Sequence, residues 1–234
     1  MVPCYTKQQL YEVADHIQAE LPKGSADTLS ERIAALPSIV VQYLPFRTPG
    51  LRGMASIDPE NQQDIILLSQ HLQVQEKGFY GAHELMHLRC HRSAGVSAFT
   101  CRDPRYPAQL PYLEWQANEG AAQITMPWKA VLQEITRCTL KQRSDILRLR
   151  LHLAQHFCVT EAMVKVRLES LRYEIQQLLQ GKVLEQITLL SAAQQLRMGI
   201  DAVSLNTIAD QLFQQELNRH KRYYAIDIFH DGMP

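Results

Sequence analysis

Residues 81–88 read Gly-Ala-His-Glu-Leu-Met-His-Leu, and this stretch decides the fold that we predict for the chain. On an α-helix, His83 and His87 lie one turn apart on the same face, so their imidazoles can hold one zinc ion. Glu84 would then lie beside the metal, placed to accept a proton from a water molecule. The five-residue pattern is short, and two surface histidines on an amphipathic helix remain the alternative at this point.

Composition and charge indicate a globular protein with no general affinity for polyanions. The chain has 234 residues, of which 46% are hydrophobic and 21% charged, and Lys plus Arg equals Asp plus Glu at 24 each. No apolar run reaches the roughly 18 residues of a membrane span, and the N-terminus lacks a signal-like apolar core. We therefore expect a soluble, cytoplasmic protein with no membrane partner. Five scattered cysteines without a C-x-x-C pair argue against a disulfide framework or a structural zinc ribbon.

Hydrophobic periodicity predicts a small sheet between helices. The expected elements are helices at Lys7–Glu20 and around Ser30–Leu36, strands at Ile39–Leu44, Met54–Ile57 and Ile65–Ser69, the motif helix at Lys77–His91, and helices at Tyr112–Met126 and Trp128–Thr136. Residues 92–111 contain three prolines and one glycine, which predicts a long loop, either a cleft rim or a disordered segment. From residue 141 onward the pattern is helical, except that residues 223–229 alternate loosely and are expected to form a late strand.

A catalytic zinc site needs a third protein ligand, and Glu114 is the best candidate. It lies 27 residues beyond His87, on the next predicted helix, which the intervening loop lets fold back. Asn118, one turn later on the same face, could accept a hydrogen bond from the second ring nitrogen of a ligand histidine. Asp103 and Glu119 are the other available carboxylates, the first in the loop and the second on a different helix face.

Three linked segments resemble the ImmA/IrrE family of zincin-like peptidases. They are HELMH at 83–87, EWQAN at 114–118 and AAQITMP at 121–127. The family reads roughly H-E-L-G-H followed, a few tens of residues later, by E-x-x-A-N-x-F-A-A-x-L-L-M-P. His91 and the strand before the motif match as well, and the resemblance covers about residues 37–170.

Two residues depart from the pattern of this family. Met86 stands where the family usually has Gly, and it is expected to alter the access of metal or substrate. Gly120 replaces the usual Phe, which should weaken its helix by about 1 kcal/mol relative to Ala. The four presumed metal and catalytic positions are intact.

The resemblance implies an α+β fold, with a zincin-like domain (a small sheet plus the HExxH helix) at residues 1–139 and a mostly helical region at 140–234. It implies a zinc-dependent metalloendopeptidase with one Zn²⁺ per chain, held by His83, His87 and Glu114, and with Glu84 as general base. The same ligand set would also accept Mn²⁺. The implied substrate is a helix-turn-helix transcriptional repressor, whose cleavage relieves repression of a mobile element or of stress genes.

Peptide hydrolysis also needs a hydrogen-bond donor for the oxyanion of the tetrahedral intermediate. Four residues are candidates by their place near the two motifs, and spacing does not rank them: Tyr80, His91, Tyr106 and Tyr112.

The alternative function is a DNA- or protein-binding regulatory module with a catalytically silent metal site. Residues 147–171 are expected to form a helix, a short turn and a second helix. Residues 137–172 carry eight basic side chains against three acidic ones, an excess of +5. They are Arg137, Lys141, Arg143, Arg148, Arg150, Lys165, Arg167 and Arg172, against Asp145, Glu161 and Glu169. This excess permits contact with DNA, while an ordinary helical pair with solvated charges is the simpler interpretation.

Overall fold

A computed structural model describes residues 4–22, 28–58, 63–102, 110–138, 140 and 142–230. The chain packs as two compact units, one formed by residues 1–128 with 157–160 and the other by residues 129–156 with 161–234. The predicted domain boundary at residue 139 concerns domains that fold independently, and it stays a prediction. Within the described ranges, every helix is too short or too polar to span a bilayer.

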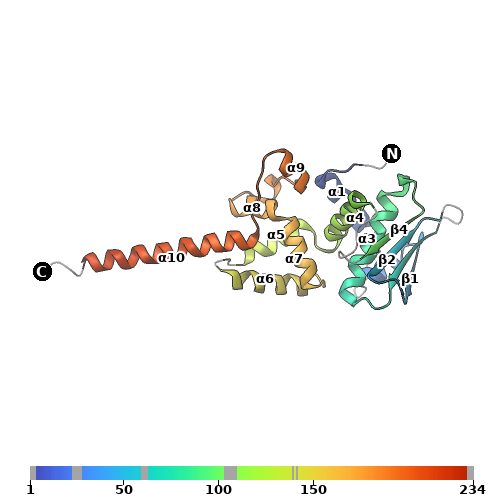
Figure 1. The fold of residues 1–234 in the computed structure, drawn as a ribbon, viewed down its shortest axis with the longest axis horizontal. Helices are drawn as coiled ribbons and strands as arrows, with labels where there is room; N and C mark the ends of the chain where they lie inside the picture. The colour runs from blue at the N-terminus through green and yellow to red at the C-terminus, as the bar shows by residue number, and fades with distance from the viewer. Residues whose placement is uncertain are drawn as a thin grey trace. The chain divides into compact units, whose positions relative to one another are not determined.

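The first unit is built on a four-stranded mixed sheet with the strand order β1-β3-β2-β4 (Figure 1). The strands are β1 (Ile39–Leu44), β2 (Leu51–Ser56), β3 (Asp64–Ser69) and β4 (Ala98–Arg102). β1 is parallel to β3, whereas β2 is antiparallel to both β3 and β4. Three strands were predicted with small shifts at their ends. β4 was not predicted, because it lies in the proline-rich stretch that we expected to be a loop.

Helices cover the sheet and position the motif. They are α1 (Lys7–Glu20), α2 (Leu29–Ala34), α3 (Val74–Cys90) and α4 (Pro111–Thr125). α3 packs on β2, β3 and β4 on one side and on α4 on the other, and α1 packs on α4. The middle of α3, residues 81–88, is therefore buried on all sides. Three polar side chains, His83, Glu84 and His87, are thereby held inside the protein, where polar groups need partners.

The two departures from the family pattern meet at the contact between α3 and α4. Met86 is fully buried, and a Cβ atom built on Gly120 would lie 2.3 Å from Met86 Cε and 2.7 Å from its Sδ. Gly120 thus provides the space that the Met86 side chain fills. Met86 was expected to alter the access of metal or substrate. Its side chain points into the helix interface, so this position gives no support to that expectation.

The second unit is helical over most of its described length. It contains nearly all of α5 (Trp128–Arg137), then α6 (Arg143–His156), α7 (Glu161–Ser170), α8 (Arg172–Leu179), the 3₁₀ turn η2 (Leu184–Gln186), α9 (Ala192–Arg197) and α10 (Leu205–His230). The predicted late strand at residues 223–229 was wrong, since α10 continues through it. Neither Gly nor Pro occurs between residues 205 and 230 to end the helix, so the short alternation does not decide the local structure.

Half of the basic side chains around α6 and α7 have ion-pair partners within this unit. Arg137, Arg148, Arg150 and Arg172 each pair with a carboxylate of the same unit, those of Glu134, Asp145, Glu161 and Glu169 respectively. Arg167 is 1% exposed. Five of the eight basic side chains are thus paired or buried. Three of the four carboxylates are already counted in the excess of +5, so Glu134 alone lowers it further, to +4, and the alternative of a DNA-binding face stays a prediction.

Candidate metal centre

Four potential ligand atoms from three side chains converge between α3 and α4. Nε2 of His83 and Nε2 of His87 lie 3.1 Å apart. The Glu114 carboxylate lies across from them, with Oε2 3.4 Å from His83 Nε2 and Oε1 3.2 Å from His87 Nε2. Both histidines are fully buried, whereas the Glu114 side chain keeps 17% exposure. The structure therefore brings together the three residues that the sequence singled out as ligands.

Neighbouring side chains determine which ring nitrogens of these histidines carry protons. Asn118 Oδ1 lies 3.0 Å from His83 Nδ1, so this nitrogen is the donor, and the contact is the one predicted from the sequence. Gln116 Oε1 lies 3.2 Å from His91 Nε2, which therefore donates. The Nδ1 of a neutral His91 is then an acceptor, and it accepts a hydrogen bond from the N–H at His87 Nδ1, 2.8 Å away. Both Nε2 atoms at the centre are left with free lone pairs.

The charge states agree with this assignment. Burial lowers the pKa of His87 to about 4 and also lowers the pKa of His91, so both rings are neutral near pH 7. Two imidazole lone pairs and one carboxylate thus face a common point.

This donor set fits a divalent cation. Ligand atoms about 2.0–2.1 Å from a tetrahedral zinc ion are about 3.3–3.4 Å from one another. The two Nε2 atoms are 3.1 Å apart, and each lies 3.2 or 3.4 Å from a different oxygen of the Glu114 carboxylate, so these separations are close to those values. Without a cation, atoms with facing lone pairs and no shared proton repel one another. Imidazole and carboxylate together suit zinc and also accept manganese.

Glu84 is the buried carboxylate beside these ligands. Among the residues that the structure describes, neither of its oxygens has a hydrogen-bond partner, and the side chain is fully buried. Burial first, and then the charge of Glu114, raises the pKa of Glu84 well above its usual range. A cation at the neighbouring ligands would lower it again, because opposite charge favours the ionised form. A carboxylate with two unused acceptor atoms is equipped to take a proton from a bound molecule.

Gly53 on β2 makes room for this carboxylate, and the sequence analysis missed it. A Cβ atom at Gly53 would lie 2.5 Å from Glu84 Oε1, closer than non-bonded atoms can approach without displacement. A glycine inside a strand often marks such a close approach, but the strand was predicted to begin at Met54, so Gly53 fell outside it.

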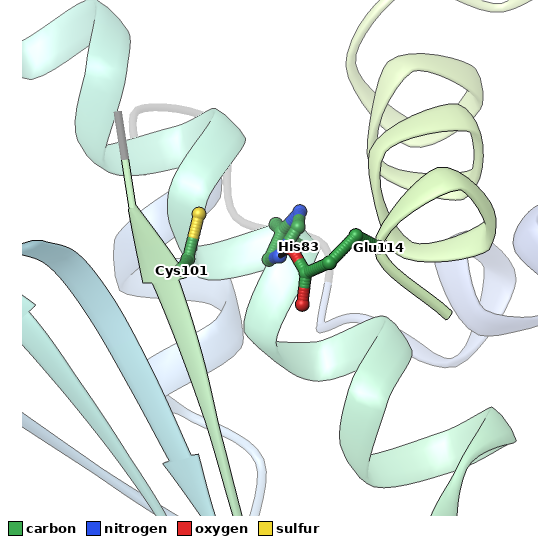
Figure 2. A group of neighbouring side chains, drawn as sticks. All are labelled: His83, Cys101 and Glu114. Atoms are coloured by element: carbon green, nitrogen blue, oxygen red, sulfur yellow. Dashed lines mark ion pairs between the residues drawn. The ribbon is translucent and has the colours of Figure 1, made fainter. Parts of the chain in front are cut away.

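β4 brings two further side chains to the centre. The Phe99 ring stacks on His87 with the centroids 4.5 Å apart and the planes 13° from parallel, which restricts the imidazole and shields it from water. Cys101 follows two residues later on the same face of the strand. Its sulfur and the ligand atoms of His83 and Glu114 all lie within 4.8 Å of one another (Figure 2). The alternation Phe-Thr-Cys could have revealed this strand.

Two donor sets therefore share His83 and Glu114, one completed by His87 and the other by Cys101. Separations of 3.1–3.4 Å in the His87 set suit one ion directly. Burial is the main reason that the pKa of Cys101 is raised well above 9.0, so the thiol keeps its proton in the absence of a metal. We favour His87 as the third ligand.

The other candidate carboxylates and donors are distributed around the centre. Glu119 accepts a hydrogen bond from Tyr11 and lies 4.0 Å from Lys7, which points to a structural role. Asp103 and Tyr106 lie outside the described residues.

The remaining oxyanion candidates have partners of their own. Both ring nitrogens of His91 are engaged, which favours a role in orienting His87. The Tyr112 hydroxyl donates to Cys4 Sγ at 3.1 Å, and burial, followed by that contact, raises its pKa to about 12. Tyr80 packs edge-on against a neighbouring aromatic ring, with the centroids 5.6 Å apart.

Comparison with known proteins identifies the family. No curated protein matches the sequence significantly. Among solved structures, a Mycobacterium tuberculosis transcriptional regulator matches with 16% identity and a TM-score of 0.47, over 70% of this chain and 47% of the regulator. The chain thus spans about half the length of that protein. A family model for the IrrE N-terminal-like domain, peptidase M78, matches residues 35–169. This match covers more than half of the chain and includes the whole cluster around α3 and α4, so the chain belongs to the family of IrrE N-terminal-like domains, which has a metallopeptidase-type fold.

Proposed function

We propose that this protein is a zinc-dependent endopeptidase with one metal site per chain, formed by His83, His87 and Glu114. The observation that supports the proposal most directly is the convergence of the His83 and His87 Nε2 atoms on the two Glu114 carboxylate oxygens, with separations of 3.1–3.4 Å. A bound zinc ion would supply Lewis acidity toward a water molecule and a peptide carbonyl.

The side chains of the protein have separate tasks in this proposal. Glu84 accepts a proton from the attacking water and returns it to the leaving nitrogen, so that it is restored after each turnover. Asn118 and His91 hold the ligand imidazoles in the tautomer that leaves Nε2 free. Phe99 excludes water from one side of His87, which strengthens the electrostatic interactions there.

The sheet supports a peptide as the substrate. β4 lies at one end of the strand order, so one edge of its backbone has no neighbouring strand among the described residues. An extended peptide can pair with such an edge through main-chain hydrogen bonds. Because β4 also carries Phe99, which stacks on His87, and Cys101, which lies near His83 and Glu114, a peptide paired there would lie along the strand that borders the metal centre. The resemblance to the ImmA/IrrE family supports a helix-turn-helix repressor as the specific target.

Metal content tests the first step. The purified, untagged protein should contain about one zinc ion per chain at the site, as measured by elemental mass spectrometry, and Glu114→Ala should lose it. Glu84→Gln should keep it, because that change leaves the three ligands in place. If wild type and Glu114→Ala hold the same amount of metal after dialysis, the assigned ligand set is wrong.

Proteolysis tests the second step. Cells that express the wild type are compared with cells that express Glu84→Gln by labelling new protein N-termini and identifying them by mass spectrometry. New termini inside a helix-turn-helix repressor, present only with the wild type, are expected. Identical sets of termini in the two strains would refute the peptidase proposal, and termini confined to other proteins would refute the repressor as target.

A further inference from the structure

A second cluster of metal-binding side chains lies in the helical unit. Glu134 on α5 and His152 and His156 on α6 place one ligand atom each within 4.8 Å of one another. We propose that these three residues form a surface site for a first-row divalent transition-metal ion such as Zn²⁺. The site shares no residue with the centre on α3 and α4, so the inference stands apart from the proposed function.

The two histidines repeat the geometry of a helical metal-binding pair. They are four residues apart, which places them one turn apart on one face of α6. Their ring centroids are 5.9 Å apart, compared with 4.8 Å for His83 and His87. Both are exposed, so an ion can reach them from solvent and the rings can rotate to close the remaining distance.

Glu134 is held in position to complete the set. Its side chain is 8% exposed, and Arg137 pairs with its Oε1. The other oxygen, Oε2, is 2.7 Å from His152 Nε2. A carboxylate anchored through one oxygen and directed at an imidazole through the other resembles the oriented ligands of natural metal sites. The arrangement therefore needs little ordering before it can bind an ion.

Binding requires one local rearrangement. Two ligands of a tetrahedral zinc ion are about 3.3 Å apart, so His152 Nε2 and Glu134 Oε2 must separate by about 0.6 Å from their present 2.7 Å. The His152 ring must carry its proton on Nδ1, which leaves the Nε2 lone pair for the ion. Two imidazoles and one carboxylate favour zinc, nickel or copper over magnesium and calcium, which prefer oxygen ligands.

The full-length protein is dialysed against buffered Zn²⁺, and the bound metal is counted by elemental mass spectrometry. Wild type should hold two ions per chain, and His152→Ala/His156→Ala should hold one. The control is His16→Ala, which removes an exposed histidine that pairs with Glu20 at 3.3 Å but belongs to no potential metal-binding group of three side chains among the described residues. This variant should keep two ions. Equal binding by wild type and His152→Ala/His156→Ala would overturn the proposal.

The Glu114→Ala background separates this inference from the peptidase proposal. With the first centre disabled, the protein should still bind one Zn²⁺, and adding His152→Ala/His156→Ala should abolish binding. Zn²⁺ should also raise the thermal unfolding midpoint of Glu114→Ala, since an ion that joins α5 to α6 stabilises the folded state, whereas Mg²⁺ should not. A chain with Glu114→Ala that binds no zinc would refute the second site. One ion in wild type and one in Glu114→Ala would support the second site and refute the first.

Discussion

Replacing Gly120 by Ala should destabilise the protein while Met86 is present and stabilise it once Met86 is shortened to Ala. The reason is the shared space between α3 and α4. The new methyl group would lie 2.3 Å from Met86 Cε, and a relaxed carbon–carbon contact is about 3.5 Å. Met86 must therefore retreat by about 1.2 Å from a position in which it is fully buried. In the Met86→Ala background the same methyl group enters a space that has already been emptied.

The expected free energies follow from these contacts. Overpacking against Met86 should lower the free energy of unfolding by about 1–3 kcal/mol. Ala is more favourable than Gly inside a helix by about 1 kcal/mol, so Gly120→Ala should be destabilising by up to about 2 kcal/mol in total. Met86→Ala alone should cost about 2–5 kcal/mol through loss of burial and formation of a cavity. In that background, Gly120→Ala should gain about 1 kcal/mol or more, because helix propensity and cavity filling act in the same direction.

Chemical denaturation in the presence of a chelator measures this coupling without a contribution from bound metal. Gly78→Ala on α3 is the matched control, because its new Cβ would meet Leu29 at an ordinary 3.4 Å. Its effect should be the same in the wild-type and the Met86→Ala backgrounds, within about 0.5 kcal/mol. If Gly120→Ala changes the free energy of unfolding equally in both backgrounds, the explanation of the exchange between positions 86 and 120 is refuted.

Three further predictions concern the metal centre. Gly53→Ala should displace the Glu84 carboxylate and reduce peptidase activity by about 100-fold or more, with the zinc content unchanged. Gly78→Ala is the control and should leave the activity intact. Equal activities of the Gly53→Ala and Gly78→Ala variants would contradict the contact between Gly53 and Glu84. Metal content after dialysis should show that Cys101→Ser keeps the zinc ion of the centre on α3 and α4 and that His87→Ala loses it. Loss of zinc from Cys101→Ser with retention in His87→Ala would make the thiol the third ligand. Removal of the metal should lower the free energy of unfolding. The decrease should be about 4 kcal/mol relative to a sample with zinc at a thousand times its dissociation constant. A denaturation midpoint that is the same with and without a chelator would argue against a bound ion.

Local sequence signals were sufficient for most of the framework. Helical spacing put His83 and His87 on one face, and a short β-branched run predicted β1. The α+β fold and the family, both expected from the two linked motifs, are confirmed. Glu114 was placed near the histidines on the assumption that the loop lets its helix fold back, and the structure brings its carboxylate within 3.4 Å of them. The catalytic and metal-binding roles of these residues stay predictions.

What was missed depends on contacts between distant segments. Met86 and Gly120 are 34 residues apart and lie on different helices, so each was interpreted separately as an unfavourable departure from the family pattern. The structure shows that the Met86 side chain occupies the space that the missing side chain of Gly120 leaves open. Cys101 and Phe99 were overlooked because nearby prolines suggested a loop, and pairing with β2 outweighed that local signal. Pairing of this kind depends on tertiary context, which no window of residues contains.

The edge of β4 that has no neighbouring strand in the described part of the chain has a consequence for the behaviour of the protein in concentrated solution. A strand edge that can accept a substrate peptide can equally accept the same edge of another molecule, which would begin an ordered aggregate. β4 is only five residues long and ends in an exposed arginine, Arg102, and short length and charge are features that limit such growth. Replacing Arg102 with a neutral β-branched residue should therefore make the protein more prone to fibril formation on storage.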